Sequence, residues 1–170
     1  MMPVFGSLGE IVEVRSFFKL ITLYNFMGMV GGSTGSGTDT SRNDVVHFSP
    51  FQTPTVVQEI PTEEAPPPRN GHTLVYINST SLLLYGGTDG ATTYFSTLHR
   101  LDLRKEGIAK WSLVPASGAV PTGRENHSFI ALTPDTFILF GGCLGLTYSD
   151  ELFLLRTAMP LSKSKMCLLQ

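Results

Sequence analysis

The sequence has few charged side chains and no cluster of basic ones. It holds 12 Lys and Arg against 14 Asp and Glu, which gives a net charge of −2. Nucleic acids and anionic membranes attract proteins through concentrated basic patches, so this composition argues against either as the main partner. Apolar residues make up 42% of the chain. This fraction is typical of a globular protein with a buried core, and it excludes a disordered acidic tail.

Cysteine and long apolar runs are also scarce. Cys143 and Cys167 are the two cysteines. They are too few for a disulfide framework and fit no zinc-site spacing, which favours a reducing compartment such as the cytoplasm and predicts no metal. The most apolar segment, residues 17–30, is interrupted by Lys19 and Asn25. It is also shorter than the roughly 20 residues that cross a bilayer. We therefore interpret it as a buried strand.

The glycine-rich stretch GGSTGSGTDTS (31–41) has the composition of a phosphate-binding loop. A loop of the Walker type needs a lysine and a hydroxyl residue after its last glycine. Here Gly37 is followed by Thr38 and Asp39, and the aspartate would repel phosphate. We expect a turn at this place and no nucleotide or other cofactor.

A glycine pair recurs three times at 55-residue intervals, as Gly31-Gly32, Gly86-Gly87 and Gly141-Gly142. Each pair ends an apolar run: FMGMVGG, SLLLYGG or TFILFGG. At the same offset, PPPRNGHTLVYINSTSLLLYGG (66–87) aligns with PTGRENHSFIALTPDTFILFGG (121–142). The common spacing and the shared left flank indicate an internal repeat.

Each repeat has the pattern of four short strands. A strand, the polar turn at 78–81 or 133–136 and a second strand ending in Gly-Gly predict a β-hairpin. A third apolar segment follows at 43–49, 96–103 and 149–155, and a fourth at 55–60 and 110–114. Helical periodicity is absent, and four strands in a unit of about 50 residues are typical of a propeller blade.

These residues resemble the kelch-repeat family. The central unit carries the pattern with Arg69, His72, Gly86, Gly87, Leu98 and Trp111, and the third with Arg124, His127, Gly141 and Gly142. The first unit is degenerate, since it keeps Gly31, Gly32, Asn43 and Asp44 but has no histidine before its glycines. The resemblance implies an all-β, kelch-type β-propeller with about three four-stranded antiparallel blades. We divide the chain into an extension (1–14), a degenerate first blade (15–68), a second blade (69–123) and a third, incomplete or divergent blade (124–170).

The repeated residue types have physical roles that can be stated in advance. Glycine in the pairs lets the backbone approach a neighbouring segment, because it lacks a Cβ. Trp111 is expected to pack on the next blade, and its replacement by valine in the first unit predicts a weaker junction between the first two blades. Arg69, His72, Arg124 and His127 allow two interpretations: hydrogen bonds between strands or blades, or a ligand-facing arginine.

Three blades are too few for a closed ring, since closed propellers use about 4–8. The expectation is a partial or truncated member of the family. A ring completed by another chain, or a small irregular assembly, are the alternatives.

The function favoured by the resemblance is a non-enzymatic module that binds a protein partner through loops on one face of the blades. The candidate contact residues are Arg42, Asp89, Tyr94, Arg124 and Tyr148. Two alternatives stay open. One is a propeller enzyme similar to copper-radical oxidases or sugar epimerases, for which Cys143 and Tyr148 are close in sequence but paired histidines and paired carboxylates are lacking. The other is a truncated product with no independent function.

The last four residues, CLLQ, match a prenylation box at Cys167, which would bring the chain to a membrane. The repeat offers a second interpretation, because KMCLL (165–169) aligns with KWSLV (110–114). The segment would then be the fourth strand of the third blade.

Overall fold

The computed structural model describes residues 19–23, 26–34, 41–49, 56–103, 108–157 and 166–169. Across these residues the chain forms strands, turns and loops, and the expected all-β class is confirmed. The described residues include no helix that is long and apolar enough to cross a membrane.

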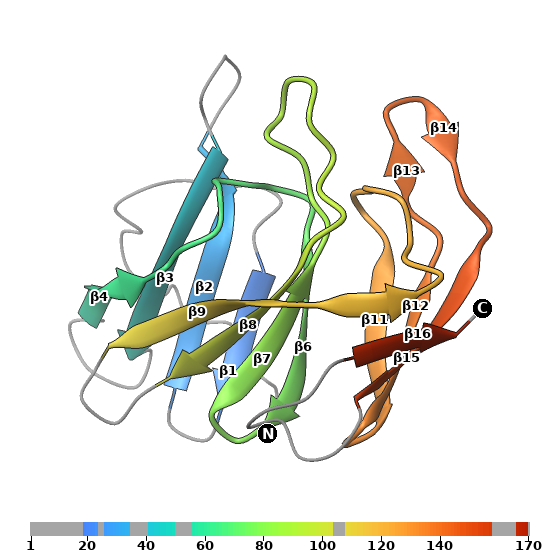
Figure 1. The fold of residues 1–170 in the computed structure, drawn as a ribbon. Helices are drawn as coiled ribbons and strands as arrows, with labels where there is room; N and C mark the ends of the chain where they lie inside the picture. Colours follow the sequence, from blue (N-terminus) through green and yellow to red (C-terminus); the bar gives the residue numbers. More distant parts are fainter. Residues whose placement is uncertain are drawn as a thin grey trace, which may run out of the picture.

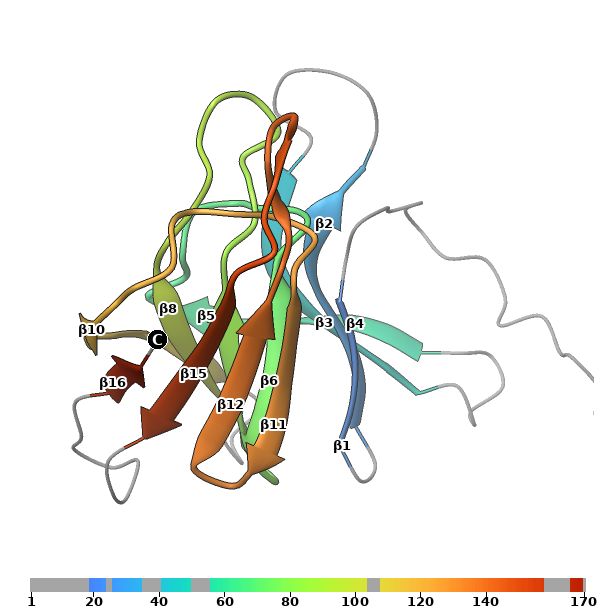
Figure 2. The same ribbon diagram turned by 90° about the vertical axis from the view of Figure 1, so that its right-hand side faces the viewer.

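Three sheets stand side by side and follow one another along the chain (Figures 1 and 2). Blade 1 has the order β1-β2-β3-β4, with β1 at Lys19–Leu23, β2 at Phe26–Ser33, β3 at Ser41–Ser49 and β4 at Val56–Ile60. Blade 2 has the order β5-β9-β8-β7-β6, with β5 at Thr62–Glu63, β6 at Thr73–Asn78, β7 at Ser81–Tyr85, β8 at Leu98–Leu103 and β9 at Ala109–Val114. Blade 3 has the order β10-β16-β15-β12-β11, with β10 at Ala116–Gly118, β11 at Ser128–Thr133, β12 at Thr136–Phe140, β15 at Leu152–Thr157 and β16 at Met166–Leu169.

The strands differ from the expectation in two places. The apolar segment 17–30 contains two strands instead of one, since β1 and β2 pair antiparallel and the register brings Leu23 opposite Phe26. Blades 2 and 3 also have five strands instead of four. The added strands, β5 and β10, come from the proline-rich linkers and pair parallel with β9 and β16. Each linker therefore covers the outer edge of the following blade, which leaves less backbone unpaired.

The predicted hairpin turns are confirmed in blades 2 and 3. β6 and β7 are joined by a two-residue turn, and the Asn78 side-chain oxygen accepts a hydrogen bond from the Thr80 N–H at 2.9 Å. β11 and β12 are joined in the same way, with the Thr136 hydroxyl donating to the Asp135 carboxylate at 3.1 Å. Short polar side chains stabilise such turns by bonding to nearby groups.

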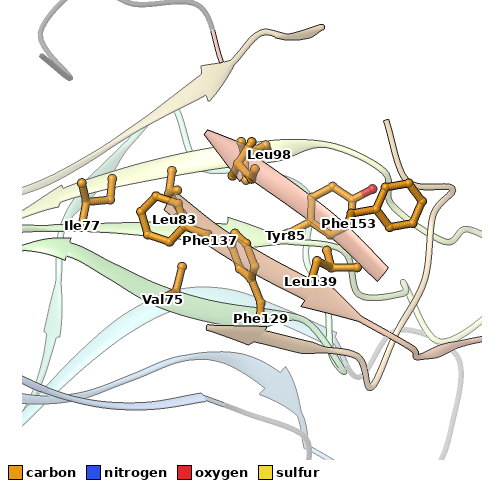
Figure 3. Close-up of a cluster of buried hydrophobic side chains, with 10 residues drawn as sticks. Val75, Ile77, Leu83, Tyr85, Leu98, Phe129, Phe137, Leu139 and Phe153 are labelled. Atoms are coloured by element: carbon orange, nitrogen blue, oxygen red, sulfur yellow. The ribbon is translucent and has the colours of Figure 1, made fainter. Parts of the chain in front are cut away.

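Two hydrophobic clusters lie between the blades. One joins blade 2 to blade 3 and contains Val75, Ile77, Leu83, Tyr85 and Leu98 opposite Phe129, Phe137, Leu139, Phe153 and Leu155 (Figure 3). The other joins blade 1 to blade 2 and contains Val30 and Val45 with Leu82, Leu84, Leu101, Ala109 and Trp111. Successive side chains of a strand point to opposite faces, so β7 is buried along its whole length between two neighbours.

Trp111 corrects one expectation. Its side chain is fully buried in the cluster with Val30 and Val45 of blade 1, so it packs on the preceding blade instead of the next one. The tryptophan therefore strengthens the junction between blades 1 and 2, which was expected to be the weaker one. The spacing of the repeat does not indicate which face of a blade packs on the preceding blade and which packs on the following blade.

The C-terminal segment forms β16, which pairs antiparallel with β15 and parallel with β10. It occupies the place of a fourth strand, and Cys167 is opposite Arg156 in the register. The side chain of Cys167 lies outside the described residues, and its lipidation stays an untested prediction.

Candidate functional site

The loops that follow the second strand of blades 2 and 3 extend from the same end of the molecule (Figure 1). We call this the loop end. It consists of the β7–β8 loop (86–97), the β12–β15 loop (141–151) and the linkers that enter blades 2 and 3 (64–72 and 119–127). The β12–β15 loop forms a small hairpin of β13 (Cys143–Leu144) and β14 (Thr147–Tyr148), where a simple loop was expected.

The glycine pairs produce the sharp turn that starts each loop. Gly86 and Gly87 have φ angles of +70° and +90°, a region that residues with a Cβ rarely adopt. The Gly87 N–H donates to the Arg124 carbonyl at 2.8 Å, and the Gly32 N–H donates to the Arg69 carbonyl at 3.1 Å. The first two pairs are therefore hydrogen-bonded to the arginine of the following unit, which is the close backbone approach that the sequence predicted.

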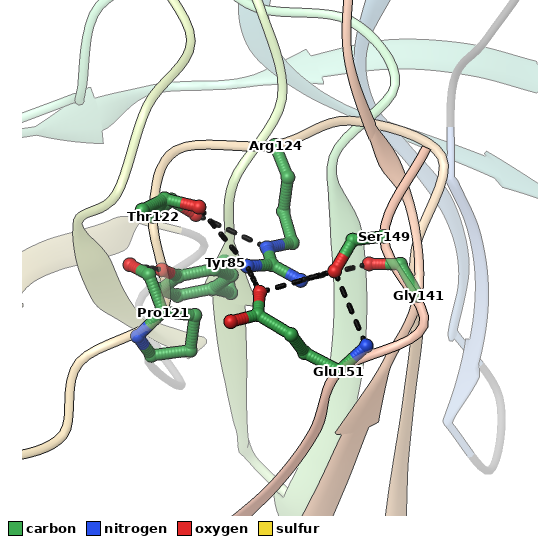
Figure 4. A network of polar contacts seen from close by, with 7 residues as sticks. All are labelled: Tyr85, Pro121, Thr122, Arg124, Gly141, Ser149 and Glu151. Carbon is green, nitrogen blue, oxygen red and sulfur yellow. Dashed lines mark hydrogen bonds and ion pairs between the residues drawn. The ribbon is translucent and has the colours of Figure 1, made fainter. Parts of the chain in front are cut away.

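Arg124 is buried at the start of blade 3, and its guanidinium joins the linker to the loop (Figure 4). Its Nε donates to the Thr122 carbonyl at 3.1 Å, and one terminal nitrogen donates to the Gly141 carbonyl at 3.0 Å. The other terminal nitrogen is 2.7 Å from the Glu151 carboxylate. This hydrogen bond lowers the pKa of Glu151 below its usual value. Arg124 is only 2% exposed, so we withdraw it as a contact residue for a partner.

Arg69 repeats this geometry in blade 2. It donates from Nε to the Pro67 carbonyl at 3.1 Å and from a terminal nitrogen to the Gly86 carbonyl at 3.0 Å. Here the ring of Phe95 lies under the guanidinium, at 4.0 Å from the ring centroid. Burial lowers the pKa of Arg69 to about 10, so it stays charged at neutral pH. The two arginines thus hold their own Gly-Gly turns, which favours their structural interpretation.

His127 fills the space between blades 2 and 3. Its Nε2 is hydrogen-bonded to the Thr73 hydroxyl, and its ring meets the ring of Tyr85 edge-on at 5.6 Å between centroids. His72 has the equivalent place between blades 1 and 2, where it is fully buried. Both histidine side chains therefore pack between neighbouring blades.

Polar contacts join neighbouring segments of the chain at the loop end. The Ser41 hydroxyl donates to the Asp89 carbonyl at 3.0 Å, and the Asn70 amide donates to the Ser41 hydroxyl at 2.9 Å. The Asp89 carboxylate accepts from the backbone N–H groups of residues 91, 92 and 93 at 2.9 to 3.0 Å. These hydrogen bonds lower the pKa of Asp89 to about 2. The Asp89 carboxylate therefore stabilises the conformation of its own β7–β8 loop.

Exposed apolar side chains cluster on the β13–β14 hairpin. Tyr148 is 83% exposed and Leu146 is 96% exposed, while Leu144 is 49% exposed. Tyr94 and Arg42 are half-buried. The Tyr94 hydroxyl lies beside Gly145, so the β7–β8 loop reaches the hairpin. Tyr148, Tyr94 and Asp89 therefore lie at the loop end as predicted by the sequence. Leu144 and Leu146 were not among the predicted contact residues, although their position in a glycine-containing loop could have indicated that they are exposed.

The repeat, the blades and the buried Arg and His residues agree with the comparison to known families. The KLHDC2/KLHL20/DRC7 Kelch-repeats domain matches residues 18–165. The chain belongs to the kelch-repeat family.

Among similar proteins are Adagio protein 3 of Arabidopsis thaliana, 30% identical over 139 residues, and Adagio-like protein 3 of Oryza sativa subsp. japonica, 32% identical over 138 residues. Each alignment covers 75% of this chain, but 22% and 21% of the relative. Acyl-CoA-binding domain-containing protein 5 of Arabidopsis thaliana is 31% identical over 90 residues, which cover 53% of this chain and 13% of the relative. The kelch chain thus spans about a fifth of the length of the first two relatives.

The two residues that the enzyme alternative singled out lie together at the loop end of these kelch blades. Cys143 and Tyr148 are partners in the β13–β14 register. Within the described ranges, no group of three His, Cys, Asp or Glu side chains converges in a way that could hold a metal ion.

Proposed function

We propose that this kelch chain is a non-enzymatic interaction module, which binds a protein partner through the loop end of its blades. The observation that carries the proposal is the cluster of exposed Leu144, Leu146 and Tyr148 on the β13–β14 hairpin. Tyrosine is enriched among the residues that contribute most of the binding energy in protein interfaces. Apolar side chains that are exposed next to one another often mark a contact surface. The free Cys143 is consistent with a reducing compartment such as the cytoplasm.

The rigidity of the loop end supports the same proposal. Asp89 fixes the β7–β8 loop through three backbone hydrogen bonds, and Ser41 and Asn70 tie that loop to its neighbours. A contact surface that is already ordered loses less conformational entropy when it binds a partner. Tyr94 of this ordered loop lies beside Gly145 of the hairpin that carries Leu146 and Tyr148.

The experiment compares proteins captured from cells by three forms of the chain: wild type, the double variant L146S/Y148S and the control L113S. Leu113 is 64% exposed on β9 and is not one of the residues that form the loop end, so it matches the loss of exposed leucine. We expect at least one captured protein to be lost with the double variant and retained with the control. A partner that is lost equally with both variants, or with neither, would count against the loop end. Melting curves of all three forms show whether the fold is intact.

A further inference from the structure

Arg69 and Arg124 have the same place in their blades, but their guanidinium groups are paired differently. The Nη2 atom of Arg124 donates to the Thr122 hydroxyl at 3.0 Å and lies 2.7 Å from the Glu151 carboxylate. The Nη2 atom of Arg69 is buried and has no hydrogen-bond partner among the described residues. A buried donor without an acceptor costs free energy, so this nitrogen favours the approach of an anion.

The linker accounts for one of the two acceptors that Arg69 lacks. The Nε atom of each arginine donates to the carbonyl two residues earlier, that of Pro67 for Arg69 and that of Thr122 for Arg124, both at 3.1 Å. Pro67 therefore has the place of Thr122, and it has no hydroxyl group. The remaining acceptor position is the one that Glu151 fills in blade 3.

The sheet register identifies the residue of blade 2 that corresponds to Glu151. The first residue of β8 pairs with the last residue of β7, as the first residue of β15 pairs with the last residue of β12. Thr97 directly precedes β8 and Glu151 directly precedes β15, so Thr97 has the place of Glu151. Thr97 is exposed, and its hydroxyl oxygen lies 3.1 Å from His99 Nε2.

A phosphate group on Thr97 would supply the acceptor that this position lacks. Glutamate and phosphothreonine place their charged oxygens the same number of bonds from Cα. Glu151 is 47% exposed and still reaches the buried Arg124, so an exposed residue at position 97 can contact Arg69 in the same way. A phosphate carries about −1.5 to −2 charges at pH 7 and forms strong hydrogen bonds with arginine. The ring of His99, beside the Thr97 oxygen, offers a second donor.

We propose that Thr97 is a phosphorylation site and that its phosphate binds the Arg69 guanidinium. A protein kinase transfers the terminal phosphoryl group of a nucleoside triphosphate to the Thr97 hydroxyl oxygen. The bond from that phosphorus to the bridging oxygen breaks, the bond to the threonine oxygen forms, and the nucleoside diphosphate and the hydroxyl proton are released. The phosphate then joins the end of the β7–β8 loop to Arg69, as Glu151 joins the β12–β15 loop to Arg124.

The first measurement determines whether the site is used. The full chain is incubated with a eukaryotic cell extract, ATP and phosphatase inhibitors, and is then digested with trypsin. Fragment spectra of the peptide 70–100 distinguish Thr97 from its neighbour Ser96. We expect phosphate at Thr97 that is absent from the variant Thr97→Val. No phosphate on the chain, or phosphate at other residues alone, would overturn the proposal.

The second measurement determines whether the phosphate is bound. Phosphothreonine is incorporated at position 97 during translation, and phosphoserine is incorporated at position 96 as the control. We expect the equilibrium constant for unfolding in urea to fall about tenfold or more with phosphate at position 97, equivalent to about 1.4 kcal/mol. Phosphate at position 96 should change it little, because neighbouring residues of an extended segment point to opposite faces. An equal effect at both positions, or none at position 97, would refute the contact with Arg69.

Ordinary variants test the same contact. Thr97→Glu should lower the unfolding constant relative to Thr97→Gln, which has the same shape without the charge, and Arg69→Met should remove this difference. The pair Glu151 and Glu151→Gln gives the size of the equivalent ion pair in blade 3. Equal stability of the Thr97→Glu and Thr97→Gln proteins would count against the proposal, and this comparison holds even if Arg69→Met fails to fold.

Discussion

The substitutions Gly86→Ala and Gly141→Ala form a matched pair that tests how the blades are joined. The two glycines have nearly the same φ, +70° and +69°, so alanine is strained by the backbone to the same extent at both. That strain is worth about 1–2 kcal/mol in the free energy of unfolding. The surroundings differ, because a Cβ added at Gly86 would lie 2.5 Å from the Arg124 carbonyl oxygen and 2.6 Å from His127 Cε1, whereas at Gly141 it would meet the Ser149 carbonyl oxygen at 3.4 Å.

The extra cost at Gly86 can be estimated from this contact. A Cβ cannot remain 2.5 Å from a backbone oxygen, so the entry segment of blade 3 must move away. Forced shifts in a packed interior typically cost about 1–3 kcal/mol. We therefore expect Gly86→Ala to lower the free energy of unfolding by about 2–5 kcal/mol in total, and Gly141→Ala by about 1–2 kcal/mol.

Urea unfolding followed by tryptophan fluorescence measures both values. Trp111 is the single tryptophan and is fully buried between blades 1 and 2, so its emission reports on loss of the packed structure. If both alanine variants lost the same stability, the contact between Gly86 and the following unit would not be what requires glycine, and the reasoning would be refuted.

Three further predictions concern buried polar and aromatic groups. Arg124→Ala should lower the free energy of unfolding by about 2–4 kcal/mol in urea titrations, because the Gly141 carbonyl loses its guanidinium donor and the Glu151 carboxylate loses its ion pair. Arg124→Lys should recover only part of this stability, since lysine cannot make the same fork of hydrogen bonds. Burial, followed by the charge of Arg69, lowers the pKa of His99 to about 4. The folded state therefore binds this proton less readily than the unfolded state, in which the pKa of histidine is near 6.5. The contribution of His99 to stability is complete above pH 6.5 and is lost as the pH falls from 6.5 to 4. His99→Asn should flatten the pH dependence of the urea midpoint in that window. Trp111→Ala should lower the free energy of unfolding by about 3–5 kcal/mol, measured by circular dichroism, and no loss would mean that the junction of blades 1 and 2 does not depend on it.

The repeat made most of the fold predictable. Gly31, Gly86 and Gly141 fixed the unit length, and the turns at 78–81 and 133–136 fixed the hairpins. These predictions were correct because the local backbone conformation requires glycine pairs and polar turn residues, and the repeat contains each of them more than once.

The added strands and the small hairpin were not predictable in this way. β5 and β10 contain two and three residues, too few to show an alternating pattern, and they form because a neighbouring strand has an open edge. The β13–β14 hairpin depends on Gly145, with a φ of +61°, in a two-residue turn. The sequence CLGLTY contains that glycine, but its flanks are too short to mark strands.

The candidate site was predicted in part. Tyr148 and Tyr94 were placed at the loop end from the position of their loops in the repeat. Arg124 was misjudged, because an arginine at the entry to a blade can face either the solvent or the glycine turn. The choice is set by the Gly141 carbonyl and Glu151, which lie 17 and 27 residues further along the chain.

A photo-crosslinking amino acid placed at position 148, and in separate proteins at positions 113 and 132, tests the central claim most directly. These positions probe the loop end, the outer edge of blade 2 and the outer face of blade 3. If the loop end binds the protein partner, irradiation in cells should yield a discrete adduct from position 148 that is absent at position 113. A partner crosslinked from position 113 or 132, with none from position 148, would contradict the account.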